Sequence, residues 1–381
     1  MTIQALQKWK ETKFKDFVRL QRGFDLPKQD RKDGVYPVIA STSITGYHDE
    51  YKVEPPCVTT GRSGALGEVL FVKSKCWPLN TVLWAKDFKG NDPYFVYSKL
   101  KTLHLEQYNS GAGVPTLNRN HLDQIIVEVP PLADQKQISN ILSTYDDLIG
   151  NNARRIQVLE QIAQVTYTEW FVNFRFPGHE KVKMIDSRTD FGKIPEGWKS
   201  AILSDLVENI REATPSGDTL KNRNYVPIDV IDSQSLTLRK YNSWTEAKSS
   251  LILFEKGDIL LGAMRPYFHK VAIAPFPGVT RGTCLVLRPK YDLAYCALTM
   301  FQKETIDFAT ANSQGATIPY INWNVLAEKR CLIPSSDVIS AYSKYTQPFL
   351  ELAQKLAQEC EKLTTSRDLL LPKLVTGEIE I

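Results

Sequence analysis

Two stretches of the chain repeat the same spacing of apolar residues, and this spacing limits the possible folds more than any other feature. In the first stretch, from Asp134 to about Phe174, apolar residues recur in alternating steps of three and four: Ile138, Leu142, Tyr145, Ile149, Ile156, Leu159, Ala163 and Trp170. The second stretch repeats the pattern with Tyr342, Phe349, Ala353, Leu356, Cys360, Leu363, Leu370 and Leu374. Such spacing is typical of helices that pair along a narrow seam. We therefore expect two long helices that pair with each other within the chain.

Prolines bound the first helix. Pro130-Pro131 disfavours helix before it and Pro177-Gly178 ends it, which leaves roughly forty residues, or about 60 Å of helix. Asn152 and Arg367 interrupt the two seams, and polar groups there typically fix register. An ordinary core helix would explain one amphipathic stretch taken alone. Two matching stretches favour pairing.

The two helices belong to a repeat that covers most of the chain. Trp9-Lys10 is matched by Trp198-Lys199, an offset of 189 (198 − 9), and Gly111 is matched by Gly315, an offset of 204 (315 − 111). The second half has therefore gained loop residues. The predicted order is domain, helix, domain, helix, with bounds at residues 1–133, 134–175, 176–335 and 336–381. A two-fold relation between the halves favours antiparallel helices and a pseudo-dimer.

Each predicted domain mixes short β-branched and aromatic runs with Gly and Pro punctuation, which indicates an α+β fold. The expected strands are Tyr36 to Ala40, Val69 to Val72 and Thr81 to Ala85 in the first domain, and Tyr225 to Ile231, Ile259 to Leu261, Val271 to Ala274 and Thr283 to Leu287 in the second. A helix is expected after Pro93 and another after Asp292.

Polar loops at matching places in the two domains carry basic, aromatic and amide groups of the kinds that contact DNA. The candidate DNA-binding residues are Lys28, Arg31, Lys32, Tyr47, His48, Arg62 and Ser63 in the first domain, and Lys221, Arg223, Asn224, Arg265, Tyr267 and His269 in the second. For any one of these residues a solvated loop is the more ordinary explanation. Their recurrence in both domains favours a shared nucleic-acid surface.

The composition sets further limits. The net charge of +4 over 381 residues is too small to argue for nucleic acid by itself. The six cysteines form no CxxC pair, so reduced thiols in a cytoplasmic protein are expected over a zinc site or a disulfide framework. The start of the chain lacks the apolar core of a signal peptide, and no apolar run is long enough to cross a membrane.

Three short motifs suggest chemistry, but none is complete. Gly61–Gly67 resembles a phosphate-binding loop, yet it lacks the lysine and runs into a strand. Asn91–Tyr94 resembles the loop with which amino-methyltransferases hold a target adenine, without its second proline. Ser110–Gly113 resembles the cofactor loop of those enzymes, but Pro115 stands where a helix should start. We therefore predict no catalytic residues and no metal site.

The amino-acid sequences of both halves resemble the specificity (S) subunit of Type I restriction-modification systems. The matching stretches of the first half include GFDLPKQDR, YPVIASTSITGYHDEY, TGRSGALGEVLFV, GVPTLNRNHL, VPPLADQKQISNIL and LIGNNARRIQVLEQIAQ. Those of the second half are IPEGW, KGDILLGAMRPYFHKVAIA, TIPYINWNVL and LLPKLVTGEIEI. The sequence after Ser335 departs from the usual opening of the second helix.

The resemblance implies two target-recognition domains joined by antiparallel helices, each domain reading one half of a split double-stranded DNA target. It also implies two methyltransferase (M) subunits, which bind S-adenosylmethionine, and restriction (R) subunits as partners, with no cofactor in this chain. Three alternatives stay open: a specificity subunit of an enzyme that cuts on both sides of its site, a degraded DNA-modifying enzyme, and a coiled-coil assembly protein that does not recognise DNA.

Overall fold

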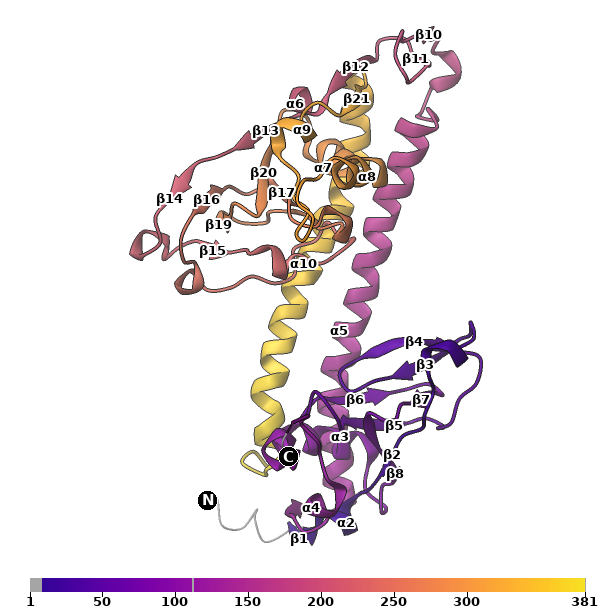
Figure 1. The fold of residues 1–381 in the computed structure, drawn as a ribbon, viewed down its shortest axis with the longest axis vertical. Helices are drawn as coiled ribbons and strands as arrows, with labels where there is room; N and C mark the ends of the chain where they lie inside the picture. The colour runs from indigo at the N-terminus through magenta and orange to yellow at the C-terminus, as the bar shows by residue number, and fades with distance from the viewer. Residues whose placement is uncertain (1–8, 112, 381) are drawn as a thin grey trace. The chain divides into compact units, whose positions relative to one another are not determined.

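The computed structural model describes residues 9–111 and 113–380, and it has the mixed α+β character that the sequence predicts. The chain divides into two compact units, which Figure 1 shows as a ribbon. Unit 1 comprises residues 1–147 and 363–381, and unit 2 comprises residues 148–362. Each long helix contributes residues to both units.

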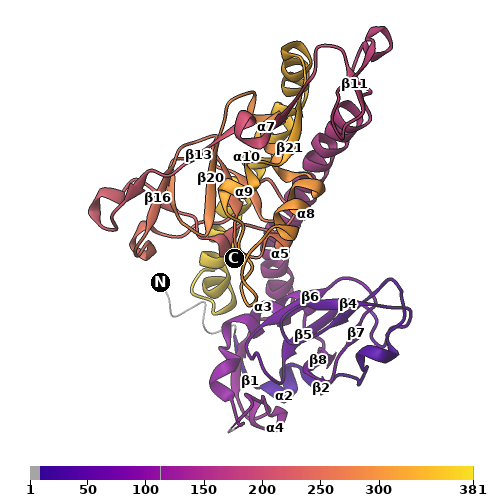
Figure 2. The same cartoon turned by 45° about the horizontal axis from the view of Figure 1, so that its top comes forward.

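The centre of unit 1 is a four-stranded antiparallel sheet in the order β2 (Arg19–Arg22), β8 (Val82–Asp87), β5 (Cys57–Gly61) and β6 (Val69–Val72), which lie side by side in Figure 2. Helix α3 (Pro93–Thr102) begins where the sequence predicts it and contacts β5 and β6. Its Phe95 and Leu100 are fully buried, together with Phe14 and Phe17 of the short helix α2 (Phe14–Phe17).

Smaller elements complete unit 1. A second sheet has the order β4 (Ile44–His48), β3 (Tyr36–Ile39) and β7 (Trp77–Pro78), and β1 (Lys10–Lys13) pairs with β9 (Ile126–Val129). The remaining short helices are η1 (Lys28–Asp30), η2 (Leu105–Tyr108) and α4 (Arg119–Leu122).

Unit 2 repeats this plan. Its first sheet has the order β13 (Val207–Ile210), β20 (Cys284–Pro289), β17 (Ile259–Gly262) and β18 (Val271–Ile273), which matches β2, β8, β5 and β6 in turn. The pair β1 and β9 is matched by β12 (Lys199–Ile202) and β21 (Arg330–Ile333). Helices α2, α3 and α4 are matched by α6 (Leu203–Leu206), α7 (Leu293–Phe301) and α9 (Trp323–Leu326). The offsets in the sequence therefore reflect a repeated fold.

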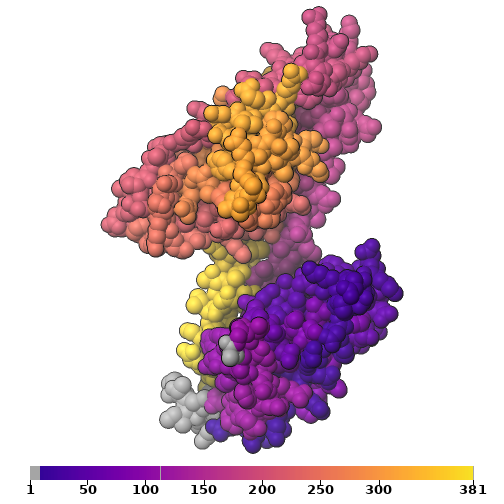
Figure 3. All heavy atoms as spheres, in the orientation of Figure 1, coloured from indigo at the N-terminus to yellow at the C-terminus, as the bar shows by residue number. Residues whose placement is uncertain are grey.

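The remaining elements of unit 2 differ from those of unit 1. A second four-stranded sheet has the order β14 (Ala213–Thr214), β16 (Leu251–Phe254), β19 (Gly278–Arg281) and β15 (Asn224–Tyr225). Helix α8 (Lys303–Ala311) follows α7, and the hairpin of β10 (Met184–Asp186) and β11 (Lys193–Pro195) follows the first long helix. Residues near position 300 and beyond contribute an orange surface to unit 2 in Figure 3. The 3-10 turns of unit 2 are η4 (His179–Lys181), η5 (Asp218–Leu220), η6 (Ile228–Val230), η7 (Trp244–Glu246) and η8 (Pro266–Phe268).

One predicted strand is wrong. The run from Tyr225 to Ile231 forms a strand only at Asn224–Tyr225 and then turns into η6. Pro227 explains the change, because it has no N–H for a sheet hydrogen bond and its ring fixes φ, here at −70°, before the turn. The apolar composition of the run indicates burial, but it does not specify the backbone conformation.

The first long helix, α5 (Leu132–Tyr167), continues into a π-helical turn, η3 (Thr168–Val172). It begins slightly before Asp134, because Pro131 fits at the edge of a helix and its carbonyl accepts from Gln135 N at 3.0 Å. The second, α10 (Ser336–Val375), begins directly after Ser335 despite the divergent sequence there.

The two long helices contact each other within each unit. In unit 2, Asn152 Nδ2 donates to Glu359 Oε2 at 3.2 Å, while Tyr342 Oη donates to the carbonyl of Ala163 at 2.9 Å. Residues with higher numbers on α5 therefore contact residues with lower numbers on α10, so the two helices pair antiparallel. In unit 1, Arg367 Nη1 contacts Asp146 Oδ1 at 2.5 Å. Both polar seam residues, Asn152 and Arg367, contact the opposite helix.

Candidate nucleic-acid interface

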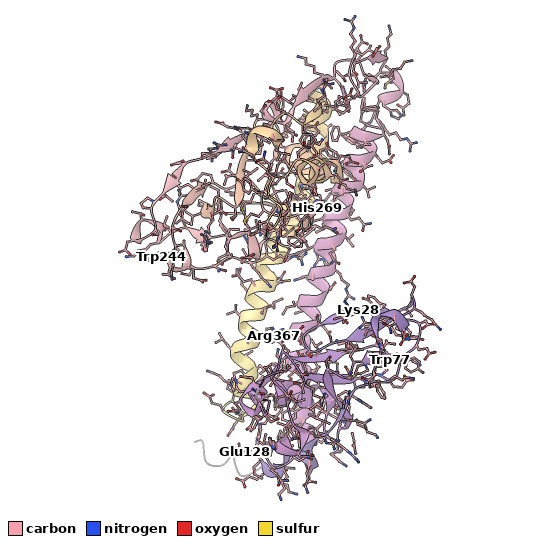
Figure 4. The ribbon with its side chains drawn as sticks, in the orientation of Figure 1. Lys28, Trp77, Glu128, Trp244, His269 and Arg367 are labelled. Carbon is pink, nitrogen blue, oxygen red and sulfur yellow. The ribbon has the colours of Figure 1, made fainter. Side chains whose placement is uncertain are left out.

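The basic loop of unit 1 lies beside the β3–β4 hairpin. Lys28 opens η1 and is exposed (Figure 4), and Arg31 Nη1 donates to the carbonyl of Thr45 on β4 at 3.4 Å. Tyr47, also on β4, is 56 % exposed. The structure thus brings Arg31 next to β4, the strand that carries Tyr47, although the two residues are 16 positions apart (47 − 31).

His48 lies inside this hairpin. Its side chain is buried, its ring packs edge-on against Trp77 at 5.1 Å, and its Nδ1 accepts from the backbone N of Lys32 at 3.1 Å. The Lys32 ammonium is exposed near Asp49, 3.9 Å away. The His48 ring is therefore not presented to solvent in this conformation, and its contact with DNA stays a prediction. The imidazole holds the basic loop against the hairpin.

The glycine-rich stretch is a turn that leads into β6, as the sequence predicts. Arg62 N donates to the carbonyl of Thr81 at 2.8 Å, and the Arg62 carbonyl accepts from Leu117 N at 2.8 Å. Ser41 Oγ, in the β3–β4 turn, donates to the carbonyl of Ser63 at 2.8 Å. These bonds place Arg62 and Ser63 next to the β3–β4 hairpin.

The matching turn of unit 2 has the same backbone hydrogen bonds. Ala263 N donates to the carbonyl of Thr283 and the Ala263 carbonyl accepts from Ile321 N, both at 2.9 Å. The hydrogen bonds also identify the residue of unit 2 that corresponds to Gly64. Arg265 N donates to the carbonyl of Pro319 at 2.7 Å, as Gly64 N donates to that of Pro115 at 3.0 Å.

Arg265 therefore takes the place of Gly64. Both residues have left-handed backbones, with φ of 49° for Arg265 and 88° for Gly64. This conformation costs an L-residue other than glycine about 1–2 kcal/mol, and such strain is concentrated at functional sites. The exposed guanidinium of Arg265 is thus maintained at an energetic cost.

Two aromatic side chains follow Arg265 in η8. Tyr267 is 50 % exposed and Phe268 is 45 % exposed, with their rings 4.9 Å apart. His269 is also left-handed, and its Nε2 lies 2.8 Å from the carbonyl of Phe301 at the end of α7. Burial holds the pKa of His269 below its ordinary value. Base reading by this imidazole stays a prediction, with one ring nitrogen engaged by the Phe301 carbonyl, whereas the side chains of Arg265 and Tyr267 are exposed.

The other basic loop of unit 2 belongs to the second sheet. Arg223 Nη2 forms an ion pair with Glu255 Oε1 at 2.9 Å, and its Nη1 donates to the carbonyl of Phe254 at 3.3 Å. Lys221 pairs with Asp218 at 3.2 Å, and Asn224 lies in β15. These three candidates thus lie in β15 or in the loop directly before it, and both Lys221 and Arg223 have acidic partners.

Sequence reasoning missed the two hairpins that support the turns. Ser110 N donates to the carbonyl of Thr116 at 2.9 Å in unit 1, and Gln314 N donates to that of Tyr320 at 2.8 Å in unit 2. Val114 and Ile318 are exposed at their tips, by 61 % and 46 %. The offset of 204 between Gly111 and Gly315 was the sequence signal that could have indicated these two hairpins. The cofactor-loop resemblance of Ser110–Gly113 includes Ala112, which lies outside the described residues.

The adenine-loop resemblance at Asn91–Tyr94 has a structural explanation. Asp92 caps α3 by accepting from the backbone N of Tyr94 and of Phe95. Ser139 Oγ of α5 donates to the same Asp92 carboxylate at 2.5 Å, and Gln135 Nε2 donates to Asn91 Oδ1 at 2.8 Å. These hydrogen bonds join α3 to the long helix, so the residues of this motif have a structural role.

In residues 9–111 and 113–380, no group of three or more His, Cys, Asp or Glu side chains could hold a metal ion. Within the same residues, none of the helices combines the length and hydropathy needed to cross a bilayer. All six cysteines are thiols, and five of them are buried.

Comparisons with known proteins agree with this geometry. The family model described as "Type I restriction modification DNA specificity domain" matches twice, at residues 7–161 and 195–359. The MjaIX specificity subunit of Methanocaldococcus jannaschii is 26 % identical over 76 % of this chain and 68 % of its own length. The MjaVIII specificity subunit of the same organism is 23 % identical over 100 % of this chain and 95 % of its own.

A solved structure shares the fold. The crystal structure of a Type I restriction-modification S subunit from M. genitalium covers 96 % of both chains with a TM-score of 0.63 at 15 % identity. The two matches of the family model fall on the two halves of the repeat and together span most of the sequence. The chain therefore belongs to the Type I restriction-modification DNA specificity family, as a specificity subunit with two copies of the family's domain.

Proposed function

We propose that this specificity subunit reads a split, asymmetric DNA target, with the first domain (residues 1–133) reading one half and the second domain (residues 176–335) the other. One observation carries the proposal. The turns at Arg62–Gly64 and Ala263–Arg265 have the same backbone hydrogen bonds but different side chains. A shared frame with different side chains is what reading two different half-sites requires.

The chemistry of the two turns supports unequal half-sites. An arginine can donate two hydrogen bonds to O6 and N7 of guanine in the major groove, and an accessible aromatic ring can contact bases or sugars. The first turn offers Arg62 next to the β3–β4 hairpin. The second offers Arg265 with Tyr267, so the donors stand at different positions of a common frame.

The long helices have a separate role in this proposal. Because α5 and α10 join the two domains, they set the distance between the two DNA segments that the domains read. Two methyltransferase subunits dock on the chain, bind S-adenosylmethionine and modify an adenine in each half-site, and restriction subunits join to cleave. The specificity subunit itself contributes recognition and positioning, without catalysis.

The test is to assemble the chain with its methyltransferase partner and map methylated adenines in the host DNA. The expected result is one motif with two unlike halves separated by a fixed gap. Methylation within a single continuous motif, or in a palindrome, would contradict the proposal. The purified chain alone should neither methylate nor cleave DNA, and turnover by it would favour a DNA-modifying enzyme instead.

A further inference from the structure

A short segment of the second domain, Gln234–Leu238, is bonded to both long helices within unit 2. On α5, the buried Glu160 accepts three hydrogen bonds at Oε1: from Ser235 Oγ at 2.9 Å, from Thr237 N at 2.8 Å and from Thr237 Oγ1 at 2.6 Å. On α10, Gln354 Oε1 accepts from Leu238 N at 3.2 Å, and its Nε2 donates to the carbonyl of Leu238 at 2.9 Å. We call these contacts the polar clamp.

The same segment is bonded to the candidate DNA-reading turn. Gln234 N donates to the carbonyl of His269, and Ile273 N on β18 donates to that of Leu236, both at 2.9 Å. His269 and β18 follow Arg265 directly in the chain. Residues 234–238 therefore connect α5 and α10 to the Arg265 turn through main-chain hydrogen bonds, which are directional and transmit orientation.

The packing beside the polar clamp is incomplete. A cavity of about 420 Å³ lies between the segment, β18 and α10, and its lining includes Leu236, Ile273, Leu350 and Lys355. Close-packed interiors resist tilting, whereas an open volume leaves room for it. On this side, the angle between domain and helix depends on the polar clamp more than on apolar contact.

The polar clamp lies in a part of the second domain that is longer than its counterpart. From the start of β13 to the start of β17 the chain runs 52 residues (259 − 207), and from β2 to β5 it runs 38 (57 − 19). Glu160 was not among the expected functional residues, because a carboxylate on a helix ordinarily faces solvent. Its burial with three donors on one oxygen is what distinguishes it.

We propose that Glu160 and Gln354 are positioning residues that fix the Arg265 turn relative to the long helices, and so fix the spacing at which the second half-site is read. The inference rests on the proposed split-site function. It predicts a division of roles: the Arg265 turn selects bases, and the polar clamp selects the gap. A clamp variant should therefore keep its base preferences while accepting more than one spacing.

The experiment selects preferred sites from random DNA with the full complex of specificity and methyltransferase subunits. Compared with wild type, Glu160→Ala should reduce discrimination between the preferred gap and gaps one base pair longer or shorter at least tenfold, with both half-site sequences unchanged. Glu160→Gln should retain most of the discrimination, because its amide oxygen can accept the same hydrogen bonds. Gln161→Ala, at the exposed neighbouring position, is the matched control.

If Glu160→Ala fails to assemble, Gln354→Met decides by the same criterion, since it keeps the length of the side chain and removes both hydrogen bonds to Leu238. Discrimination between gaps that stays within twofold of wild type would overturn the inference. So would an altered second half-site at unchanged spacing. Failure of the proposed function is distinct, because wild type itself would then show no split site.

Discussion

The two domains share a sheet order but are attached to the long helices by different chemistry. In unit 1, apolar packing of Ile138, Leu142 and Leu374 against the domain is joined by a buried polar contact. The Tyr94 hydroxyl donates to Asp146, which also pairs with Arg367 of α10. Burial, followed by the hydrogen bond to Asp146, raises the pKa of Tyr94 and keeps it a donor. In unit 2 the attachment is aromatic, with Phe171 in contact with Tyr295 and Tyr342 at centroid distances of 4.8 Å.

This difference shows what a repeated fold keeps and what it changes. The backbone hydrogen bonds of the turns are the same in both units, so the frame that presents side chains is kept. Beside its contact with the long helices, unit 1 has a buried hydrogen bond and an ion pair, whereas unit 2 has a cluster of aromatic rings in edge-on contact together with the polar clamp.

The largest effect should come from the aromatic attachment. Phe171→Ala should destabilise unit 2 by roughly 3–5 kcal/mol, because it removes a buried ring and leaves a cavity among Tyr167, Tyr295 and Tyr342. Hydrogen exchange of amides in each unit would measure it, with the exposed Val172→Ala as control. Equal losses of protection in units 1 and 2 would contradict the separation of their cores.

The polar attachment of unit 1 should be worth less. Arg367→Met should cost about 1.5–3 kcal/mol, because Asp146 loses its charged partner and retains the Tyr94 hydroxyl. Denaturant unfolding would report the loss, and Lys373→Met, exposed on the same helix, should have little effect. A loss no greater than that of the control would mean that the pair is solvated and does not hold the domain.

The Arg265 turn should show opposite effects on stability and recognition. Arg265→Gly should stabilise unit 2 by about 1 kcal/mol by relieving the left-handed backbone, and should weaken discrimination at one position of one half-site by about 1–3 kcal/mol. Thermal unfolding and competition among DNA sequences measure the two effects. Gly64→Ala, with open space for its Cβ, should strain the first turn by a similar amount and leave the second half-site unchanged. A loss of affinity that is uniform across sequences would identify Arg265 as a phosphate contact.

The smallest effect concerns pH. Since the pKa of His269 is lowered in the folded state by burial, the unfolded chain takes up the proton first as pH falls below 6.5. Unit 2 should therefore lose stability from pH 6.5 downward and be unaffected above it. His269→Gln should flatten this part of the stability profile, measured as urea midpoints at pH 7 and pH 5. An unchanged profile would assign the acid loss to other groups.

Sequence reasoning identified the long helices, the repeat and the α+β class because each rests on a periodic signal. It did not identify burial. His48 and His269 have side chains of the kind that contact DNA, but in the folded chain their rings contact Trp77 and the Phe301 carbonyl instead of facing solvent. The correspondence of Arg265 to Gly64 was also hidden, since it appears only in shared hydrogen bonds to Pro319 and Pro115. The polar clamp depends on the burial of Glu160, which no local sequence pattern predicts.

The central claim is that each domain reads one half-site on a common frame, and exchanging one domain tests it most directly. Residues 1–130 would be replaced by those of a related specificity subunit, and the chimaera assembled with its methyltransferase partner. Sites selected from random DNA should then carry one new half-site, with the other half-site and the gap unchanged. A change in both half-sites, or in neither, would contradict the account.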